Sequence, residues 1–143
     1  MNKLTVSSCE LCDSAGGHPL WQDELCRVVL VEDPDYPGFC RVILNRQVKE
    51  MTDLDTATRQ RLMRVVFATE QALRELMQPG KINLASFGNM VAHLHWHVIA
   101  RFADDKHFPG SIWSEARRAG VPRPLDRDAL RRVLHKLLQP VAE

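Results

Sequence analysis

The sequence predicts an α+β protein in which a mostly antiparallel sheet of about five strands combines with one long helix and a C-terminal helix. The main reason is the order of the apolar patterns along the chain, which runs from strands to a helix, back to strands and again to a helix. The 143 residues, 45% hydrophobic and 26% charged, are ordinary for a globular domain with one core. We therefore expect a single domain over residues 1–143, with its core in 25–102, an N-terminal piece in 1–24 and a C-terminal helical extension in 105–143.

Two short runs early in the chain are typical of paired strands. Residues 25–31 and 39–44 are rich in β-branched side chains, and acidic residues and prolines follow the first run. The residues between them, 32–38, have the composition of a loop, with two prolines and a glycine. Because this loop is short, we expect the two runs to pair with each other.

A longer apolar pattern follows, and its period is that of a helix. Over residues 51–77, apolar side chains recur at spacings of three, four and seven, with charged residues between them. Thr52 is the expected N-cap, and Asp55 stands three residues later as an approximate capping box. Pro79 and Gly80 are expected to end this helix.

The second half of the chain is predicted to contain two more strands and a last helix. The strands are expected at residues 81–87 and 93–102, joined around Gly88 and Asn89. Asp126 is the expected N-cap of the last helix. The apolar stripe of that helix consists of Leu130, Val133, Leu134, Leu137 and Leu138.

The charge balance limits the classes of partner. Nineteen Lys and Arg against eighteen Asp and Glu give a formal charge of +1, so no overall field would hold nucleic acid or a membrane surface. Residues 1–10 lack the apolar core of a signal peptide, and no stretch approaches 18 apolar residues. We expect a cytoplasmic protein that binds neither nucleic acid nor a membrane, with its four cysteines present as thiols or metal ligands.

The most informative feature is a run of histidines at alternate positions, His93, His95 and His97. A crude count gives about 0.01 for such clustering by chance, so the run needs a cause. On a strand, alternate residues share one face, and the apolar residues between the histidines would occupy the other. The imidazoles would then form a row that faces a common ligand. Such a row can bind a transition metal or serve phosphoryl chemistry, and histidines without a role are the third interpretation.

This run and the residues before it resemble the histidine triad family. The family motif is His-φ-His-φ-His-φ-φ, where φ is apolar, and residues 93–99 match all seven positions. The expected order of strand, helix, strand and motif strand agrees as well. The resemblance covers about residues 25–102 and implies a HIT-like fold, usually in a homodimer, that hydrolyses or transfers nucleotides.

The resemblance also implies roles for the three histidines. His95 is the expected nucleophile, which attacks the α-phosphorus and forms a nucleotidyl-histidine. A backbone carbonyl would hold its Nδ1-H, so that the other ring nitrogen faces phosphorus. His97 would donate to phosphate oxygens, and His93 would support the strand pair and orient the site.

Further residues match the family with less detail. Asn83, Gly88 and Asn89 fall in the stretch from which the family contacts phosphate, although a plain hairpin turn is the alternative. Met90 departs from the pattern, because members often carry Ser or Thr there to assist the leaving group. Asp33, or its neighbour Glu32, follows the first strand where the family places a group on the ribose hydroxyls.

Other candidates come from strand parity and side-chain type. Arg101 shares the parity of the three histidines and is a candidate cation for additional phosphates at the mouth of the site, with an ordinary surface arginine as the alternative. Trp21, Trp113 and Phe108 are candidates to stack on a base, although tryptophan in a small domain is more often part of the core.

Cys9 and Cys12 form a Cys-x2-Cys pair, which is half of a zinc site. Some histidine triad proteins complete such a site with one histidine after the second strand and one from the triad. Here Gln47 stands at the first of those positions, and glutamine is a poor zinc ligand. We therefore expect that no cofactor is required, and a structural zinc at Cys9 and Cys12 stays an open alternative.

Together these features predict a hydrolase or nucleotidyl transferase that attacks the α-phosphate of purine nucleotides. The substrate would be a dinucleoside polyphosphate or a nucleoside phosphoramidate, so that a P-O-P or a P-N bond is cleaved. Two alternatives stay open: a regulatory module that binds nucleotides without turnover, and a metal-dependent hydrolase with the histidine row as ligands.

Overall fold

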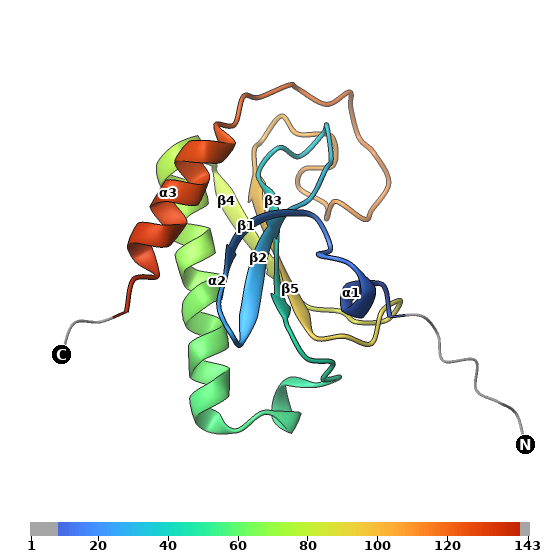
Figure 1. Ribbon diagram of the computed structural model, residues 1–143. Helices are drawn as coiled ribbons and strands as arrows, with labels where there is room; N and C mark the ends of the chain where they lie inside the picture. The colour runs from blue at the N-terminus through green and yellow to red at the C-terminus, as the bar shows by residue number, and fades with distance from the viewer. Residues whose placement is uncertain (1–8, 141–143) are drawn as a thin grey trace, which may run out of the picture.

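The computed structural model describes residues 9–140, and the parts of the expected domain in 1–8 and 141–143 lie outside the described residues. One antiparallel sheet organises the described chain (Figure 1). Its strands are β1 (His18–Gln22), β2 (Cys26–Leu30), β3 (Phe39–Leu44), β4 (Lys81–Ala85) and β5 (His95–Arg101). Their order across the sheet is β1-β2-β3-β5-β4, and each neighbouring pair is antiparallel. The predicted α+β class with a five-stranded antiparallel sheet is therefore confirmed.

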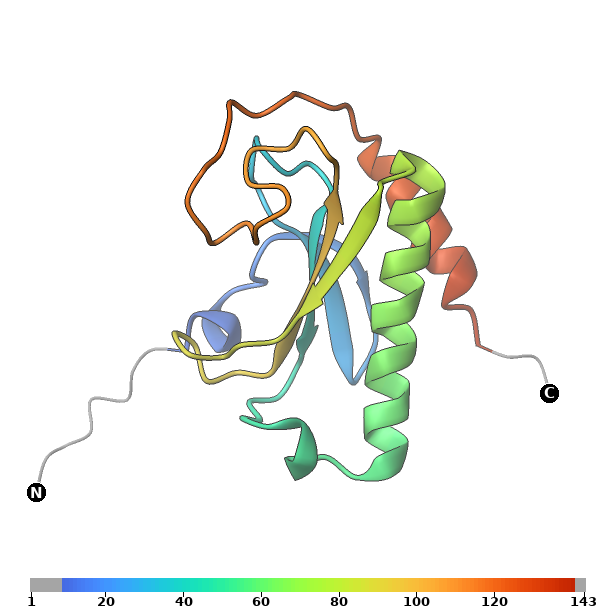
Figure 2. The same cartoon turned by 180° about the vertical axis from the view of Figure 1, so that it is seen from behind.

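The two larger helices lie on the same face of the sheet and leave the other face to other segments. The long helix α2 (Thr56–Met77) and the C-terminal helix α3 (Arg127–Leu137) pack together and cover one face. Seen from behind, the one-turn helix α1 (Glu10–Asp13) and the long connection between β5 and α3 lie on the other side of the sheet (Figure 2). Burial of apolar side chains between the sheet and α2 stabilises the fold, at about 25 cal/mol per Å² of apolar area. No helix in the described part of the chain has the length and apolarity needed to cross a membrane.

The long helix begins later than the sequence predicts. Met51–Asp53 is a separate 3₁₀ turn, closed by a capping box between Glu50 and Asp53. The α-helix starts at Thr56, and Asp55, not Thr52, is its N-cap, with a side-chain oxygen that accepts from the Thr58 N–H. The expected capping residue was therefore wrong because the chain makes two consecutive starts. The C-terminal end agrees, because α2 stops at Met77, and Asp126 caps α3 as expected.

Two short elements near the N-terminus have no clear sequence signal. β1 contains a proline and shows a register irregularity between Pro19 and Trp21 against β2, as befits an edge strand. α1 is only one turn long, and its N-cap is Cys9, whose sulfur accepts from the Cys12 N–H. Both elements are held by tertiary contacts and not by local propensity.

The motif strand is shorter than expected. β5 begins at His95, not at His93, and alternate residues along it face opposite layers. Val98 and Ala100 belong to the core beneath α2, whereas Ile99 packs in a separate cluster with Tyr36. The odd-numbered face of β5, which carries His95 and His97, is thus the face that α2 does not cover.

Candidate active site

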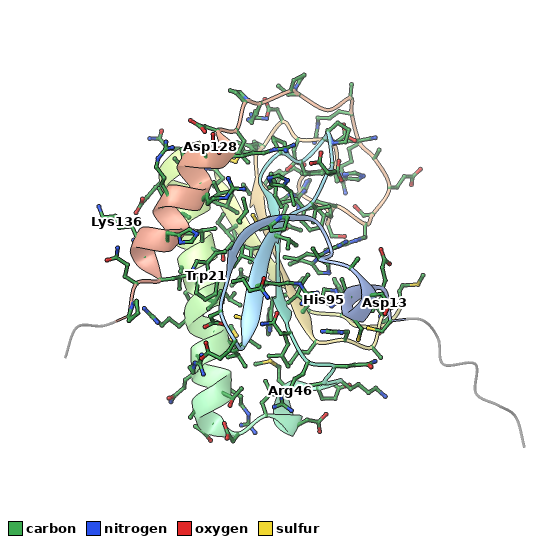
Figure 3. All side chains as sticks on the ribbon, viewed as in Figure 1. Asp13, Trp21, Arg46, His95, Asp128 and Lys136 are labelled. Carbon is green, nitrogen blue, oxygen red and sulfur yellow. The ribbon has the colours of Figure 1, made fainter. Side chains whose placement is uncertain are left out.

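His95 and His97 share the face of β5 that is turned away from α2. Their ring centroids are 4.9 Å apart, and the two residues are 8% and 6% exposed. In the view of Figure 3, His95 lies on the same side of the sheet as Asp13 of α1, while Trp21 lies toward α2. The strand period therefore brings two of the three histidines to one small area of the sheet, under the N-terminal segment.

A backbone carbonyl fixes the tautomer of His95. Its Nδ1 is 2.6 Å from the carbonyl oxygen of His93, and a carbonyl only accepts, so Nδ1 carries the proton. Nε2 is then left with a lone pair, as a nucleophilic imidazole requires. Burial lowers the pKa of His95 below 6.5 and the charge of Arg41 adds to this, while the hydrogen bond to His93 opposes it. The ring is therefore neutral at pH 7. Ser86 Oγ donates to the His95 carbonyl at 2.7 Å and ties the strand to the loop after β4.

His97 lies in a more apolar environment than His95. Burial first, and then the charges of His95 and Arg41, lower the pKa of His97 to about 4. Its Nδ1 is buried and has no hydrogen-bond partner among residues 9–140. Phe39 packs against the ring, with centroids 5.6 Å apart. His97 is thus neutral at pH 7, and a neutral ring still offers one N–H to an anion.

Arg41 is a neighbour of these histidines that the sequence analysis did not single out. It lies on β3 directly opposite His97, so their side chains share a face. Arg41 Nη1 donates to the Gly16 carbonyl at 3.0 Å, its Nε is buried without a partner, and no carboxylate in the described chain forms a salt bridge with it. Alternation along the strand, with Phe39 and Ile43 on the same face, is the signal that could have identified it. A half-buried arginine without a carboxylate is suited to an anionic ligand.

The third histidine faces the cysteine pair instead of the other two rings. His93 Nε2 donates to the Leu44 carbonyl, which leaves a lone pair on Nδ1. That nitrogen is 3.2 Å from Cys9 Sγ and 3.3 Å from Cys12 Sγ. The candidate ligand atoms of these three residues all lie within 4.8 Å of one another. The structure therefore brings together residues 84 positions apart into one cluster, which we call the thiol cluster: Cys9, Cys12 and His93.

The thiol cluster fits a tetrahedral zinc ion. Ligand bonds of 2.3 Å to sulfur and 2.0 Å to nitrogen place tetrahedral sulfur and nitrogen ligands about 3.5 Å apart, near the spacing seen here. Gln47 lies at the remaining side, with Oε1 3.7 Å from Cys12 Sγ. The cluster supplies three protein ligands, and an amide oxygen or water would have to supply the fourth.

Arg101 does not lie at the mouth of the site, which corrects the expectation from strand parity. It is 1% exposed, and its Nε donates to Asp105 Oδ2 at 2.8 Å. Nη1 donates to Asn83 Oδ1 at 2.6 Å, and Nη2 donates to Asp105 Oδ1 and to the Gly110 carbonyl. Strand parity correctly predicts that Arg101 shares a face with the histidines. However, Arg101 lies at the end of β5, where the segment that follows β5 covers it. The guanidinium of Arg101 is thus already bonded to Asn83 and Asp105.

The two acids considered for the ribose lie in another part of the molecule. Glu32 pairs with Arg127 at 2.9 Å, and Asp33 accepts from the Asp35 N–H within its own loop. Both line a cavity of about 480 Å³ whose other walls include Leu30 and Leu125, and no triad histidine lines it. The structure therefore does not bring Glu32 or Asp33 together with His95.

Gly88 and Asn89 lie in the loop that joins β4 to the histidine strand. Gly88 has a φ of +70°, which favours glycine, and with Ser86 and His95 it lines a cavity of about 280 Å³. Asn89 is exposed, and the side chain of Met90 is 97% exposed. This loop is thus near His95 and open to a ligand.

The three candidate stacking residues occupy different environments. Trp21 packs against the core beneath α2, and Phe108 lies beside the Arg101 guanidinium, which is 5.6 Å from its ring centroid. Trp113 is 4.9 Å from the His97 ring, between centroids. Of the three, only Trp113 adjoins the histidines.

Comparison with known proteins agrees with this geometry. A model of the HIT domain matches residues 16–104, which is more than half of the chain. A comparison with curated proteins gave no match.

Several solved structures are similar over most of their length. A histidine triad protein from Bradyrhizobium japonicum is 28% identical, with a TM-score of 0.71 over 84% of this chain and 92% of its own. A histidine triad protein from Marinobacter aquaeolei is 31% identical, with a TM-score of 0.68 over 90% of this chain and 93% of its own. A third, from Sinorhizobium meliloti, is 26% identical, with a TM-score of 0.66 over 87% and 90%. The sheet, the motif strand and these matches together show that the chain belongs to the histidine triad (HIT) domain family.

Proposed function

We propose that this protein is a nucleotide hydrolase or nucleotidyl transferase that attacks the α-phosphate of purine nucleotides through a nucleotidyl-histidine at His95. The observation that carries the proposal is the hydrogen bond from His95 Nδ1 to the His93 carbonyl. It leaves the Nε2 lone pair available on a neutral ring, which is the form that can attack phosphorus. The substrate is a dinucleoside polyphosphate or a nucleoside phosphoramidate.

The reaction proceeds in two displacements at phosphorus. His95 Nε2 forms a bond to the α-phosphorus as the P-O or P-N bond to the leaving group breaks and the leaving group takes up a proton. Water then attacks the nucleotidyl-histidine, the P-N bond to His95 breaks, and a nucleoside monophosphate is released. His97 donates an N–H to the phosphate oxygens as charge develops, which is stabilisation by a preorganised donor.

The phosphate contacts come from the histidine face and the neighbouring loop. Arg41 takes the role first considered for Arg101, because it adjoins His97 and carries no carboxylate partner in the described chain. Gly88 and Asn89 contribute loop contacts, since their loop adjoins His95. Asn83 is left out of this set because Arg101 already occupies its side-chain oxygen.

Zinc in the thiol cluster is a second proposal. The two sulfurs and the His93 Nδ1 would hold the ion, and its contribution is structural: it would fix α1 against the strand that carries the nucleophile. The proposal is supported by the free lone pair on His93 and the short contacts from both thiols. No step of the reaction depends on this ion. Elemental analysis of the purified protein, with Cys9→Ser as the control, tests it.

A homodimer is the expected assembly. β4 is an edge strand, so one side of its backbone is free to pair. On the outer surface, the Phe67 side chain of α2 is 55% exposed. Light scattering at working concentration tests this expectation, and a monomer mass would remove it.

The covalent step is tested by intact-protein mass spectrometry. Wild type, His95→Ala and His97→Ala are mixed briefly with adenosine phosphoramidate or with diadenosine tetraphosphate, and products are followed by chromatography. An adenylyl mass in wild type, or trapped in His97→Ala, but absent from His95→Ala supports the proposal and identifies the bond cleaved. Nucleotide binding with neither adduct nor product favours a regulatory module.

A metal-dependent hydrolase is tested by a separate measurement of activity with a chelator and with added metal. Its activity would be lost to a chelator and restored by added metal, whereas the proposed chemistry needs no metal at His95. The geometry gives this alternative less support, because the His95 Nδ1 proton is held by a carbonyl and the His93 ring faces the thiols.

A further inference from the structure

The segment that follows β5 is built around one buried carboxylate. Asp105 is 3% exposed and forms the ion pair with Arg101. Its two oxygens also accept the backbone N–H groups of Phe102, His107 and Phe108. A buried charge is costly unless it is paired and hydrogen-bonded, and here both requirements are met within a few residues.

Two arginines hold the rest of the segment through its backbone carbonyls. Arg101 Nη2 donates to the Gly110 carbonyl at 2.7 Å, and Arg118 donates to the carbonyls of Asp105 and Phe108. The segment is therefore anchored on both sides by guanidinium groups, although none of residues 102–118 belongs to a helix or a strand. Figure 2 shows it folded back over the side of the sheet opposite α2.

This anchoring brings Trp113 to the histidine face. Its ring centroid is 4.9 Å from that of His97 and 6.3 Å from that of Phe39. Phe87 approaches from the other direction, from the loop after β4, and its ring is 5.1 Å from Trp113 and 6.3 Å from His97. Three aromatic rings from three separate segments thus surround one catalytic imidazole.

Two of these rings keep a large free surface. Phe39 is 4% exposed and forms part of the floor, but Trp113 is 50% exposed and Phe87 is 58% exposed. The rings of Trp113 and Phe87 are nearly perpendicular, at 80°. A planar ligand can therefore stack on one ring while its edge meets the other, the two arrangements that aromatic pairs prefer.

We propose that Trp113 and Phe87 form a stacking subsite beside His97 for a planar aromatic group of the substrate. The group is the base of the attacked nucleotide or an aromatic leaving group on its α-phosphate. The segment from Phe102 to Arg118 then serves to supply one wall of this subsite. The inference rests on the proposed function for the identity of the ligand as a nucleotide.

The first experiment separates the base from the rest of the nucleotide. Calorimetric titration compares AMP with ribose 5-phosphate on wild type, Trp113→Ala, Trp113→Phe and Phe87→Ala, with Trp21→Phe as the control. Stacking on an aromatic side chain contributes roughly 5- to 150-fold per base. If the base occupies the subsite, Trp113→Ala weakens AMP binding by that factor and leaves ribose 5-phosphate within twofold. Trp113→Phe retains most of the affinity because a stacking face remains.

The second experiment tests the leaving group. The phenyl and methyl esters of AMP are titrated against His95→Asn, which keeps both esters intact, with and without Trp113→Ala. If the leaving group occupies the subsite, the preference for the phenyl ester is lost in Trp113→Ala while AMP affinity stays unchanged. Thermal unfolding of each variant verifies that the protein still folds. If Trp113→Ala does not fold, Trp113→Phe gives a second test.

Either pattern supports the subsite and identifies its occupant. The inference is wrong if Trp113→Ala changes neither the preference for AMP over ribose 5-phosphate nor the preference for the phenyl over the methyl ester by more than twofold. It is also wrong if wild type binds none of these ligands. A Trp113-dependent affinity for AMP without any adduct at His95 would refute nucleotidyl transfer and leave the subsite in place. The two failures are therefore distinguishable.

Discussion

Replacing Asp105 by alanine tests whether the buried ion pair holds the segment that follows β5. The change leaves the Arg101 guanidinium, 1% exposed, without its carboxylate, and it removes the acceptor of three backbone N–H groups. Breaking a buried pair by removing one partner costs about 3–5 kcal/mol. With about 2.1 cal/mol/K per residue over 143 residues, the unfolding entropy is about 0.3 kcal/mol/K, so Tm should fall by about 10–17 °C.

Asp104 provides a matched control at the neighbouring position. Its salt bridge with Arg123 is largely solvated, since the Asp104 side chain is 55% exposed, and such pairs contribute about 0–1 kcal/mol. Urea and thermal unfolding, followed by circular dichroism, would be measured for both alanine variants. An Asp105→Ala variant within 1 kcal/mol of Asp104→Ala would show that the ion pair does not hold this segment.

Three further outcomes are expected. Burial and the charge of Arg41 lower the pKa of His95, so its ring stays neutral at pH 6.5. We therefore expect kcat/KM to fall with increasing acidity only below pH 6.5. A pH profile in which kcat/KM already falls at or above pH 6.5 would contradict this. Arg41→Met should raise KM for adenosine phosphoramidate by about 10- to 100-fold, as expected for the loss of a charge-assisted contact, with Arg41→Lys intermediate; steady-state kinetics that leave KM within twofold would refute the assignment. Gln47→His adds a nitrogen as the fourth ligand beside the thiol cluster and should tighten zinc binding at least tenfold in a competition with a chelator. An unchanged zinc affinity would argue against zinc at this place.

The sequence predicts the fold well where patterns are long and periodic. The 22-residue helix α2 and the strands of the central pairs agree with the predicted positions to within a few residues, apart from the helix start. That start escaped prediction because Glu50 and Asp55 each cap a separate turn, and either cap could have served a single helix. β1 escaped because only pairing with β2 makes a five-residue run containing a proline into a strand.

The candidate site divides along a similar line. Strand alternation places His95 and His97 on one face, and the local sequence is sufficient for that. The contacts of His93 with Cys9 depend on a separation of 84 residues, which no local pattern encodes. Arg101 was misassigned because parity fixes a face but not what covers it, and the covering segment is anchored by that same arginine.

Two separate groups of contacts thus support the histidine face of the sheet. On one side, the thiol cluster contacts the ring of His93, whose carbonyl in turn orients His95, so the proposed nucleophile is positioned from the residues just before its strand. On the other side, the Arg101–Asp105 pair holds the segment that brings Trp113 to His97. The first support acts on the ring of the proposed nucleophile, and the second acts on the aromatic side chains beside it. Changes in the first should therefore act mainly on the chemical step, and changes in the second mainly on the choice and affinity of ligand.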